Sequence, residues 1–231
     1  METCSHSTIG DVLFTLIARD LRANFRLGSG IWLPLTMFLT IVVLIPIGIG
    51  PDINLHSKIA PVILWIGVVF SLFLFLDRIF SPDLEDGSLD RIAASDLPLE
   101  KYVWSKIIVL WISSGLLLTI LAPFLGLLLN LPLQVGLICS SSILTGSPAL
   151  AAIGCLGGGI GTFNRHGNLL QTVVVLPLSI PILIFGTKSV IAYSNGEPYL
   201  PWVLQLSGIS LASIAIFPFL ISYTLKTVLE E

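Results

Sequence analysis

Five long stretches without a charged residue limit what this chain can fold into more than any other feature. They cover residues 27–51, 59–76, 107–164, 166–187 and 198–225. A helix needs about 20 mostly apolar residues to cross the hydrocarbon core of a bilayer, and these stretches supply that length. Charged residues make up only 11% of the chain, against about 25% in an ordinary soluble domain. We therefore predict an all-α integral membrane protein.

The uncharged stretches divide into six predicted membrane spans. The stretch from Ile107 to Asn164 is too long for one crossing, and it divides at Asn130-Leu131-Pro132, a sequence typical of a turn. The segment 194–198, Ser-Asn-Gly-Glu-Pro, is the most turn-like of the chain. We treat residues 1–231 as a single transmembrane domain. The predicted spans lie near residues 31–50, 59–76, 107–129, 133–160, 168–187 and 201–223.

The distribution of lysine and arginine predicts the orientation of the spans. Short cytoplasmic connections of membrane proteins carry an excess of these residues. If the N-terminus is cytoplasmic, nine basic residues lie on the inner side and only Lys58 and Lys188 on the outer side, so we expect both termini in the cytoplasm. The nine are Arg19, Arg22, Arg26, Arg78, Arg91, Lys101, Lys106, Arg165 and Lys226.

Residues 8–26 have the pattern of an amphipathic helix. Apolar residues recur every four positions from Ile9 to Phe25, and Thr15, Arg19 and Arg22 populate another face. One interpretation is a helix on the inner leaflet, with its arginines toward lipid headgroups. The other is a helix packed on a partner's surface.

Several classes of function have no support in the sequence. No acidic or basic residue lies centrally in a span, as a proton or ion pathway would require, and the chain has no phosphate-binding P-loop. The scattered basic residues form no stripe for nucleic acid. Cys4, Cys139 and Cys155 are too few and too dispersed for a disulfide framework or a metal site. We identify no catalytic residue, so another chain would have to supply the energy for any work.

Two features inside the spans are candidates for movement and for packing. Pro177 and Pro181, four residues apart in one span, are the best hinge candidates, although ordinary kinks are an equal alternative. Small residues in the fourth span allow close approach of another helix, either within the subunit or between subunits. They are Ser147, Ala151, Gly154, Cys155, Gly158 and Gly159.

The segment 77–106, between the second and third spans, is the one substantial charged region. Ser81-Pro82-Asp83 predicts a helix start. An apolar stripe follows at positions 89, 92, 93 and 97, beside acidic residues at 83, 85, 86 and 90. An anionic inner leaflet repels an acidic helix, so the stripe would dock on a cytoplasmic partner. The alternative is a solvated connector folded against the bundle.

The arrangement of this loop resembles permeases of the ABC-2 exporter type, in which the corresponding loop is the coupling helix that docks on the ATPase. More narrowly, the chain resembles the haem exporter B subunit of bacterial cytochrome c maturation, from about residue 10 to the C-terminus. The segment Asp83-Leu84-Glu85-Asp86-Gly87-Ser88-Leu89 is the specific part of the match. Supporting segments, in the same order, are 45–51 (IPIGIGP), 58–61 (KIAP), 76–80 (LDRIF), 97–99 (LPL) and 176–181 (LPLSIP).

The resemblance implies a six-span permease subunit in the bacterial inner membrane that is not itself an enzyme. ATP would bind to a partner ATPase (the A type). Further partners would be a haem-handling membrane subunit (C type), a small single-span subunit (D type), membrane lipid and a second copy of this chain. Haem would be the substrate or belong to a partner. The residues implied in ATPase coupling are Asp83, Glu85, Asp86, Gly87, Ser88, Leu89 and Ile92.

Three alternatives stay open. The subunit could transmit ATPase motion to release a haem-loaded carrier without forming a haem channel, since His6, His56 and His166 are sparse as ligands and lie in predicted loops or ends. An ABC-2 permease that exports a lipid, glycan or drug would share the fold and the loop. A structural membrane scaffold would need no coupling helix.

Overall fold

The computed structural model describes residues 9–26, 29–74, 76, 79–89, 98–163 and 167–229. Over these ranges the backbone forms helices and turns and no strand. Six helical segments are long and apolar enough to cross a membrane. The prediction of an all-α protein with six spans is therefore confirmed.

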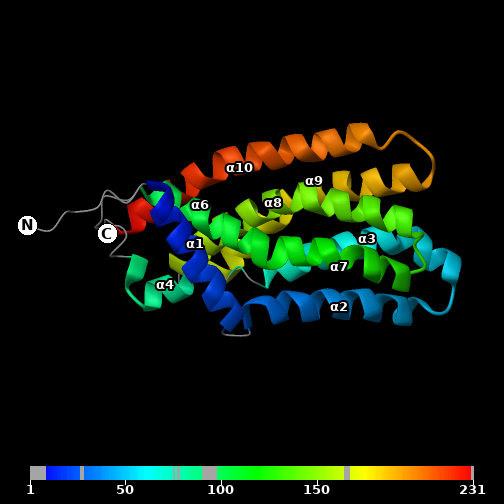
Figure 1. The fold of residues 1–231 in the computed structure, drawn as a ribbon, viewed down its shortest axis with the longest axis horizontal. Helices are drawn as coiled ribbons and strands as arrows, with labels where there is room; N and C mark the ends of the chain where they lie inside the picture. Colours follow the sequence, from blue (N-terminus) through cyan, green and yellow to red (C-terminus); the bar gives the residue numbers. More distant parts are fainter. Residues whose placement is uncertain are drawn as a thin grey trace, which may run out of the picture.

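The spans run side by side along the long axis of the molecule (Figure 1). The third span consists of three consecutive helical segments, α6, a π-helix and α7. The bounds in chain order are α2 Ser29–Ile49, α3 Ile53–Phe73, α6 Leu99–Leu110, the π-helix Trp111–Leu116, α7 Leu117–Leu128, α8 Leu133–Phe163, α9 Gly167–Ser194 and α10 Leu200–Leu229.

Four helices extend at least six residues beyond the predicted spans. The third span begins at Leu99, directly after Pro98, instead of near residue 107, and α3 begins at Ile53 instead of near residue 59. Helix α9 continues past Lys188 to Ser194, and α10 continues to Leu229 instead of ending near residue 223. The prediction placed span ends at the first charged residue. A helix in a bilayer can continue through its polar ends, because its backbone hydrogen bonds remain satisfied within the helix.

The turn that divides the long uncharged stretch lies where the sequence predicts it. Asn130 has a φ of 58°, in the left-handed region that asparagine tolerates better than most residues. This conformation lets the Leu131 amide donate to the Gly126 carbonyl at 2.9 Å, which ends α7. Pro132 follows, and α8 begins at Leu133.

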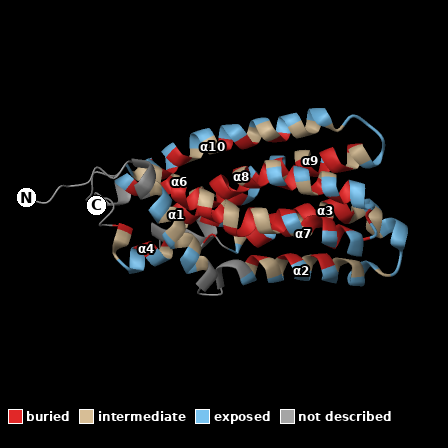
Figure 2. Cartoon of the chain, viewed as in Figure 1, coloured by how far each residue is buried: buried red, intermediate tan, exposed pale blue. Residues whose placement is uncertain are grey.

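Helix α8 occupies the centre of the bundle and packs against α9, α10, α7 and α6. Of its membrane-spanning part, 72% is buried inside the chain, against 17% for α2. Figure 2 shows buried residues concentrated along the middle helices and exposed residues along α10 and α2. The exposed residues of α2 and α10 are mostly large and apolar, as expected for surfaces that face lipid.

Trp65 on α3 is the largest side chain that is fully buried. Its ring lies against Gly146 of α8 and Gly186 of α9, where a side-chain Cβ would overlap the ring. Its indole N–H donates to Ser142 Oγ at 3.2 Å. Glycine and serine thus make room for one large aromatic ring at the junction of three spans.

Two short or peripheral helices lie at one end of the bundle (Figure 1). Helix α1, Ile9–Arg26, crosses this end obliquely and packs on α6 and α2. Helix α4, Ser81–Glu85, lies in the connection between α3 and α6. The other end carries the α2–α3, α7–α8 and α9–α10 connections (Figure 1).

Candidate functional site

Helix α4 forms the first part of the acidic loop and is shorter than predicted. It begins at Ser81, with Pro82 in its first turn, and ends at Glu85. Gly87 has a φ of +63°, which a right-handed helix cannot contain, so the helix stops before it. Glycine adopts this angle without the strain that a residue with a Cβ would have. The expectation of one amphipathic helix that begins at Ser81 and carries the apolar stripe from Leu89 onward is corrected, because α4 ends before Gly87. Ile92, Ala93 and Leu97 lie outside the described residues.

The carboxylate of Asp83 is directed inward from α4 and is only 6% exposed. It accepts hydrogen bonds from Tyr102 Oη at 2.6 Å and from Arg19 Nη2 at 2.9 Å. Ser88 Oγ lies 3.0 Å from the same carboxylate, and Lys106 Nζ forms an ion pair with it. One side chain of the loop therefore contacts α1, α6 and its own following turn.

A second carboxylate completes the cluster from α1. Asp20 accepts from Lys106 Nζ at 2.7 Å and from Arg19 Nε at 2.9 Å. Lys106 also lies 5.3 Å from the centre of the Tyr102 ring. Two carboxylates and two cations thus alternate, with a formal sum of zero. We call Arg19, Asp20, Asp83, Tyr102 and Lys106 the inner-end ion cluster, after the end of the bundle that the distribution of basic residues predicts to face the cytoplasm.

Burial and ion pairing shift the pKa of the Asp83 carboxyl in opposite directions. Burial raises the pKa of its carboxyl, because an ionised group loses hydration. The Lys106 ammonium, the Tyr102 hydroxyl and the Arg19 guanidinium outweigh this effect and hold the pKa below the usual value. Asp83 is therefore ionised at neutral pH, and its charge is balanced within the chain.

The predicted coupling residues divide between the interior and the surface. Leu89 is fully buried, so this part of the apolar stripe packs into the chain itself. Leu84 is the exposed apolar residue of α4, 39% accessible, and it lies next to exposed Glu85 and Asp86. Gly87 and Ser88 are partly buried. Within the described part of the loop, the exposed residues of α4 and its end are therefore Pro82, Leu84, Glu85 and Asp86, and we call the last three its outward surface.

The small residues of the fourth span pack within this chain. Ser147, Ala151 and Cys155 are fully buried. A Cβ on Gly158 would lie 2.8 Å from the Leu76 carbonyl oxygen, and one on Gly154 would lie 2.9 Å from the Leu76 side chain. Gly159 faces Ile221 of α10. These contacts are between helices of one subunit.

Pro177 and Pro181 lie inside α9, which continues as a helix from Gly167 to Ser194. Both prolines are exposed, on a face that includes Val173 and Ile180 among its exposed apolar residues. If α9 bends at these prolines, the bend would therefore lie on the exposed surface of the bundle.

Two features of the third span have no signal in the sequence pattern. The π-helix Trp111–Leu116 interrupts the span, and the Trp111 indole N–H donates to Ser147 Oγ at 3.1 Å. Tyr102 and Lys106 bond to residues of α1 and α4 that are distant in the sequence. Lys106 immediately precedes a long uncharged stretch, but this position does not identify Asp20 and Asp83 as its partners.

Haem ligands and metal ligands do not gather in the part of the chain that the structure describes. No group of three or more His, Cys, Asp or Glu side chains suited to a metal ion occurs there. His56 lies in the first turns of α3, and its Nε2 is buried without a hydrogen-bond partner. The start of α3 lies at the opposite end of the bundle from α1 and α4 (Figure 1). His6 and His166 lie outside the described residues.

Comparisons with known proteins agree with one another. The family model described as "CcmB protein" matches residues 11–228. "Heme exporter protein B" of Paracoccus denitrificans is 42% identical over 91% of this chain and 97% of its own length. The protein of the same name from Bradyrhizobium diazoefficiens is 42% identical over 93% and 97%. That of Pseudomonas aeruginosa is 31% identical over 96% and 100%. The chain belongs to the CcmB protein family.

Proposed function

We propose that this chain is the membrane permease of an ATP-driven haem-export complex for cytochrome c maturation. The support is family membership over residues 11–228, together with relatives named heme exporter protein B that match nearly end to end. Six apolar spans fit the membrane part of such a transporter. The chain is a transporter component and not a catalyst on its own.

The coupling role rests on one observation: Asp83 is bonded on its inner side to α1 and α6, while its neighbours Leu84, Glu85 and Asp86 are exposed. A force applied to the exposed residues would reach two further helices through short, buried bonds. Loops that transmit rigid-body motion need such a connection to the moving helices. In our proposal, the partner ATPase docks on the outward surface of α4.

The same proposal includes the location of the complex and its other subunits. The inner-end ion cluster lies at the end predicted to be cytoplasmic, where an ATPase would bind. The complex would lie in the bacterial inner membrane, with both termini of this chain in the cytoplasm. A haem-handling membrane subunit, a small single-span subunit and a second copy of this chain would complete it. ATP would bind the ATPase, and haem would pass as substrate or stay on a partner.

The test is co-purification of the complex from detergent, with ATPase activity and haem absorbance as readouts. Glu85→Lys reverses a charge on the outward surface of α4. We expect this variant to keep its membrane partners and haem absorbance but to lose the ATPase, since an opposing surface would repel the new charge. The matched control is Glu100→Lys, which reverses an exposed acid at the start of α6, at the same end of the bundle.

Three results would contradict the proposal. If Glu85→Lys and Glu100→Lys lose the ATPase equally, docking depends on general charge and not on α4. If the native chain brings down an ATPase but no haem protein, an ABC-2 exporter of a lipid, glycan or drug becomes the better assignment. Recovery of no ATPase with the native chain would favour a scaffold.

A further inference from the structure

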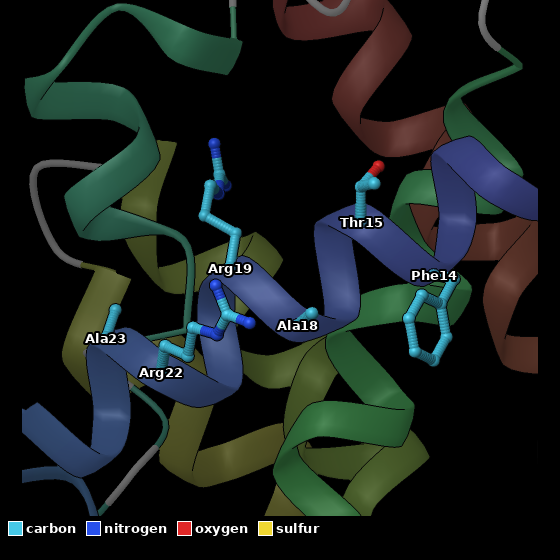
Figure 3. Close-up of a pocket in the computed structure, with 6 residues that line it drawn as sticks. All are labelled: Phe14, Thr15, Ala18, Arg19, Arg22 and Ala23. Carbon is cyan, nitrogen blue, oxygen red and sulfur yellow. The ribbon is translucent and has the colours of Figure 1, made fainter. Parts of the chain in front are cut away.

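Helix α1 carries a groove whose lining residues all belong to this one helix. The groove has a volume of about 580 Å³ and is lined by Phe14, Thr15, Ala18, Arg19, Arg22 and Ala23. Figure 3 shows Arg19 and Arg22 toward one end of the groove and the Phe14 ring at the other. Between them, the small side chain of Ala18 fills little of the groove, and Ala23 lines it beyond Arg22.

Charge in this groove is unbalanced. Arg19 shares its guanidinium with Asp20 and Asp83, and Lys106 is bonded to the same two carboxylates. Arg22 is exposed, and it has no ion pair among the residues that the structure describes. Because the cluster sums to zero, Arg22 leaves one net positive charge at the groove. An anion would supply the missing partner.

The groove also combines this charge with an apolar group at the level of the membrane surface. Phe14 is 71% exposed and lies about two helical turns from Arg22 on the same helix. Only positions 27 and 28 separate α1 from α2, whose membrane-spanning part begins at Trp32. Trp32 is 63% exposed, as expected for an aromatic residue at the membrane–water interface. Helix α1 therefore lies beside the point where a span leaves the bilayer.

We propose that this groove binds the headgroup of one anionic phospholipid, with Arg22 paired to the phosphate and Phe14 against the start of the acyl chains. An exposed aromatic ring beside a cation fits the boundary between headgroups and acyl chains. An acidic protein surface would satisfy Arg22 but would offer nothing apolar at that depth for Phe14. The inference goes beyond haem export, and it needs no ATPase.

The bound lipid would have a second effect because Arg19 belongs to both the groove and the ion cluster. A phosphate at Arg22 lies one helical turn from the guanidinium that bonds to Asp83. It would hold α1 against the membrane while α4 is held to α1. A force passed from α4 through Asp83 and Arg19 would then reach a helix that is anchored at the membrane surface.

The test counts lipids retained by the purified full chain in native mass spectra, after equilibration with mixed micelles of phosphatidylglycerol or phosphatidylcholine. We expect the native chain to retain phosphatidylglycerol in preference. Arg22→Gln should reduce this retention roughly fivefold, the factor expected for one cation at an anionic surface. Arg22→Lys should restore most of it. Ala23→Trp, which fills the groove without changing charge, should reduce the retention of either lipid.

The matched control is Lys101→Gln, which removes a cation in the first turn of α6, outside the groove. It should retain phosphatidylglycerol as the native chain does. Equal retention of the two lipids by the native chain would overturn the proposal, as would equal losses in Arg22→Gln and Lys101→Gln. Displacement of the lipid by millimolar inorganic phosphate would show a site for free anions and would also overturn it. Because the lipid is counted on the purified chain without an ATPase, failure of the proposed ATPase docking would not change the retention of phosphatidylglycerol.

Discussion

Tyr102 donates a hydrogen bond of 2.6 Å to Asp83 Oδ2, across 19 positions of sequence. The Tyr102 side chain is fully buried, and its ring packs against Phe80 with the ring centres 6.1 Å apart. Hydrogen bonds to an ionised group out of water are stronger than neutral ones. The start of the third span and the loop that precedes it are therefore held as one unit.

Asp83→Asn tests the cost of unbalancing the inner-end ion cluster. Removal of one charge leaves Arg19 and Lys106 to share Asp20, and Lys106 is only 8% exposed. We expect the free energy of unfolding to fall by about 3 kcal/mol, as for other buried pairs that lose one partner. The measurement is unfolding in mixed micelles followed by tryptophan fluorescence. Glu85→Gln, on exposed Glu85, is the control and should change little; equal effects would contradict the prediction.

The lowered pKa of Asp83 predicts how stability depends on acid. The folded chain keeps Asp83 ionised to a lower pH than the unfolded chain, whose aspartates titrate near 3.8. The stabilisation is therefore complete above that value and is lost as the pH falls below it toward the folded pKa. Comparing unfolding at about pH 5 and about pH 3 should show a larger loss for the native chain than for Asp83→Asn. An equal loss of stability in the native chain and in Asp83→Asn between these two pH values would contradict the prediction.

Gly186→Ala tests the packing around Trp65. The added methyl group would overlap the indole ring, which is fully buried and hydrogen-bonded to Ser142. We expect a loss of about 1–3 kcal/mol, the usual range for an overpacked core. Gly208→Ala in α10 is the matched control, since nothing lies within 4 Å of its added Cβ. Alanine favours a helix more than glycine does, so the control should be neutral or more stable.

Ser147→Ala tests the contact between the π-helix and α8. Ser147 is fully buried, and its Oγ accepts from Trp111 at 3.1 Å. Without it the indole N–H loses its acceptor, which costs about 1–3 kcal/mol when the donor is buried. Ser147→Thr keeps an acceptor but adds a methyl group close to Gly115. Trp111 fluorescence should shift in Ser147→Ala; an unchanged spectrum with unchanged stability would contradict this role for the bond.

Several features of the fold could be predicted because they depend on local composition. The lengths of the uncharged stretches gave six spans, and Asn130-Leu131-Pro132 placed the turn between α7 and α8. Span ends were less accurate, as at Leu99, because a helix does not stop where its sequence becomes polar. The start of α4 at Ser81-Pro82 followed from capping preferences, whereas its end at Gly87 required a backbone angle that sequence does not specify.

The sequence by itself determined that this chain lies in a membrane, how many times it crosses, and which loop carries its charge. These properties follow from the free energy of placing each residue in hydrocarbon or water, which depends on the residue and its near neighbours. Only the tertiary structure decided that Asp83 and Leu89 face inward while Leu84 and Glu85 face outward. It also decided that Arg19 pairs with Asp83 and that Asp20 pairs with Lys106. Such pairings depend on how separate helices pack, and a local pattern carries no information about the partner that lies opposite.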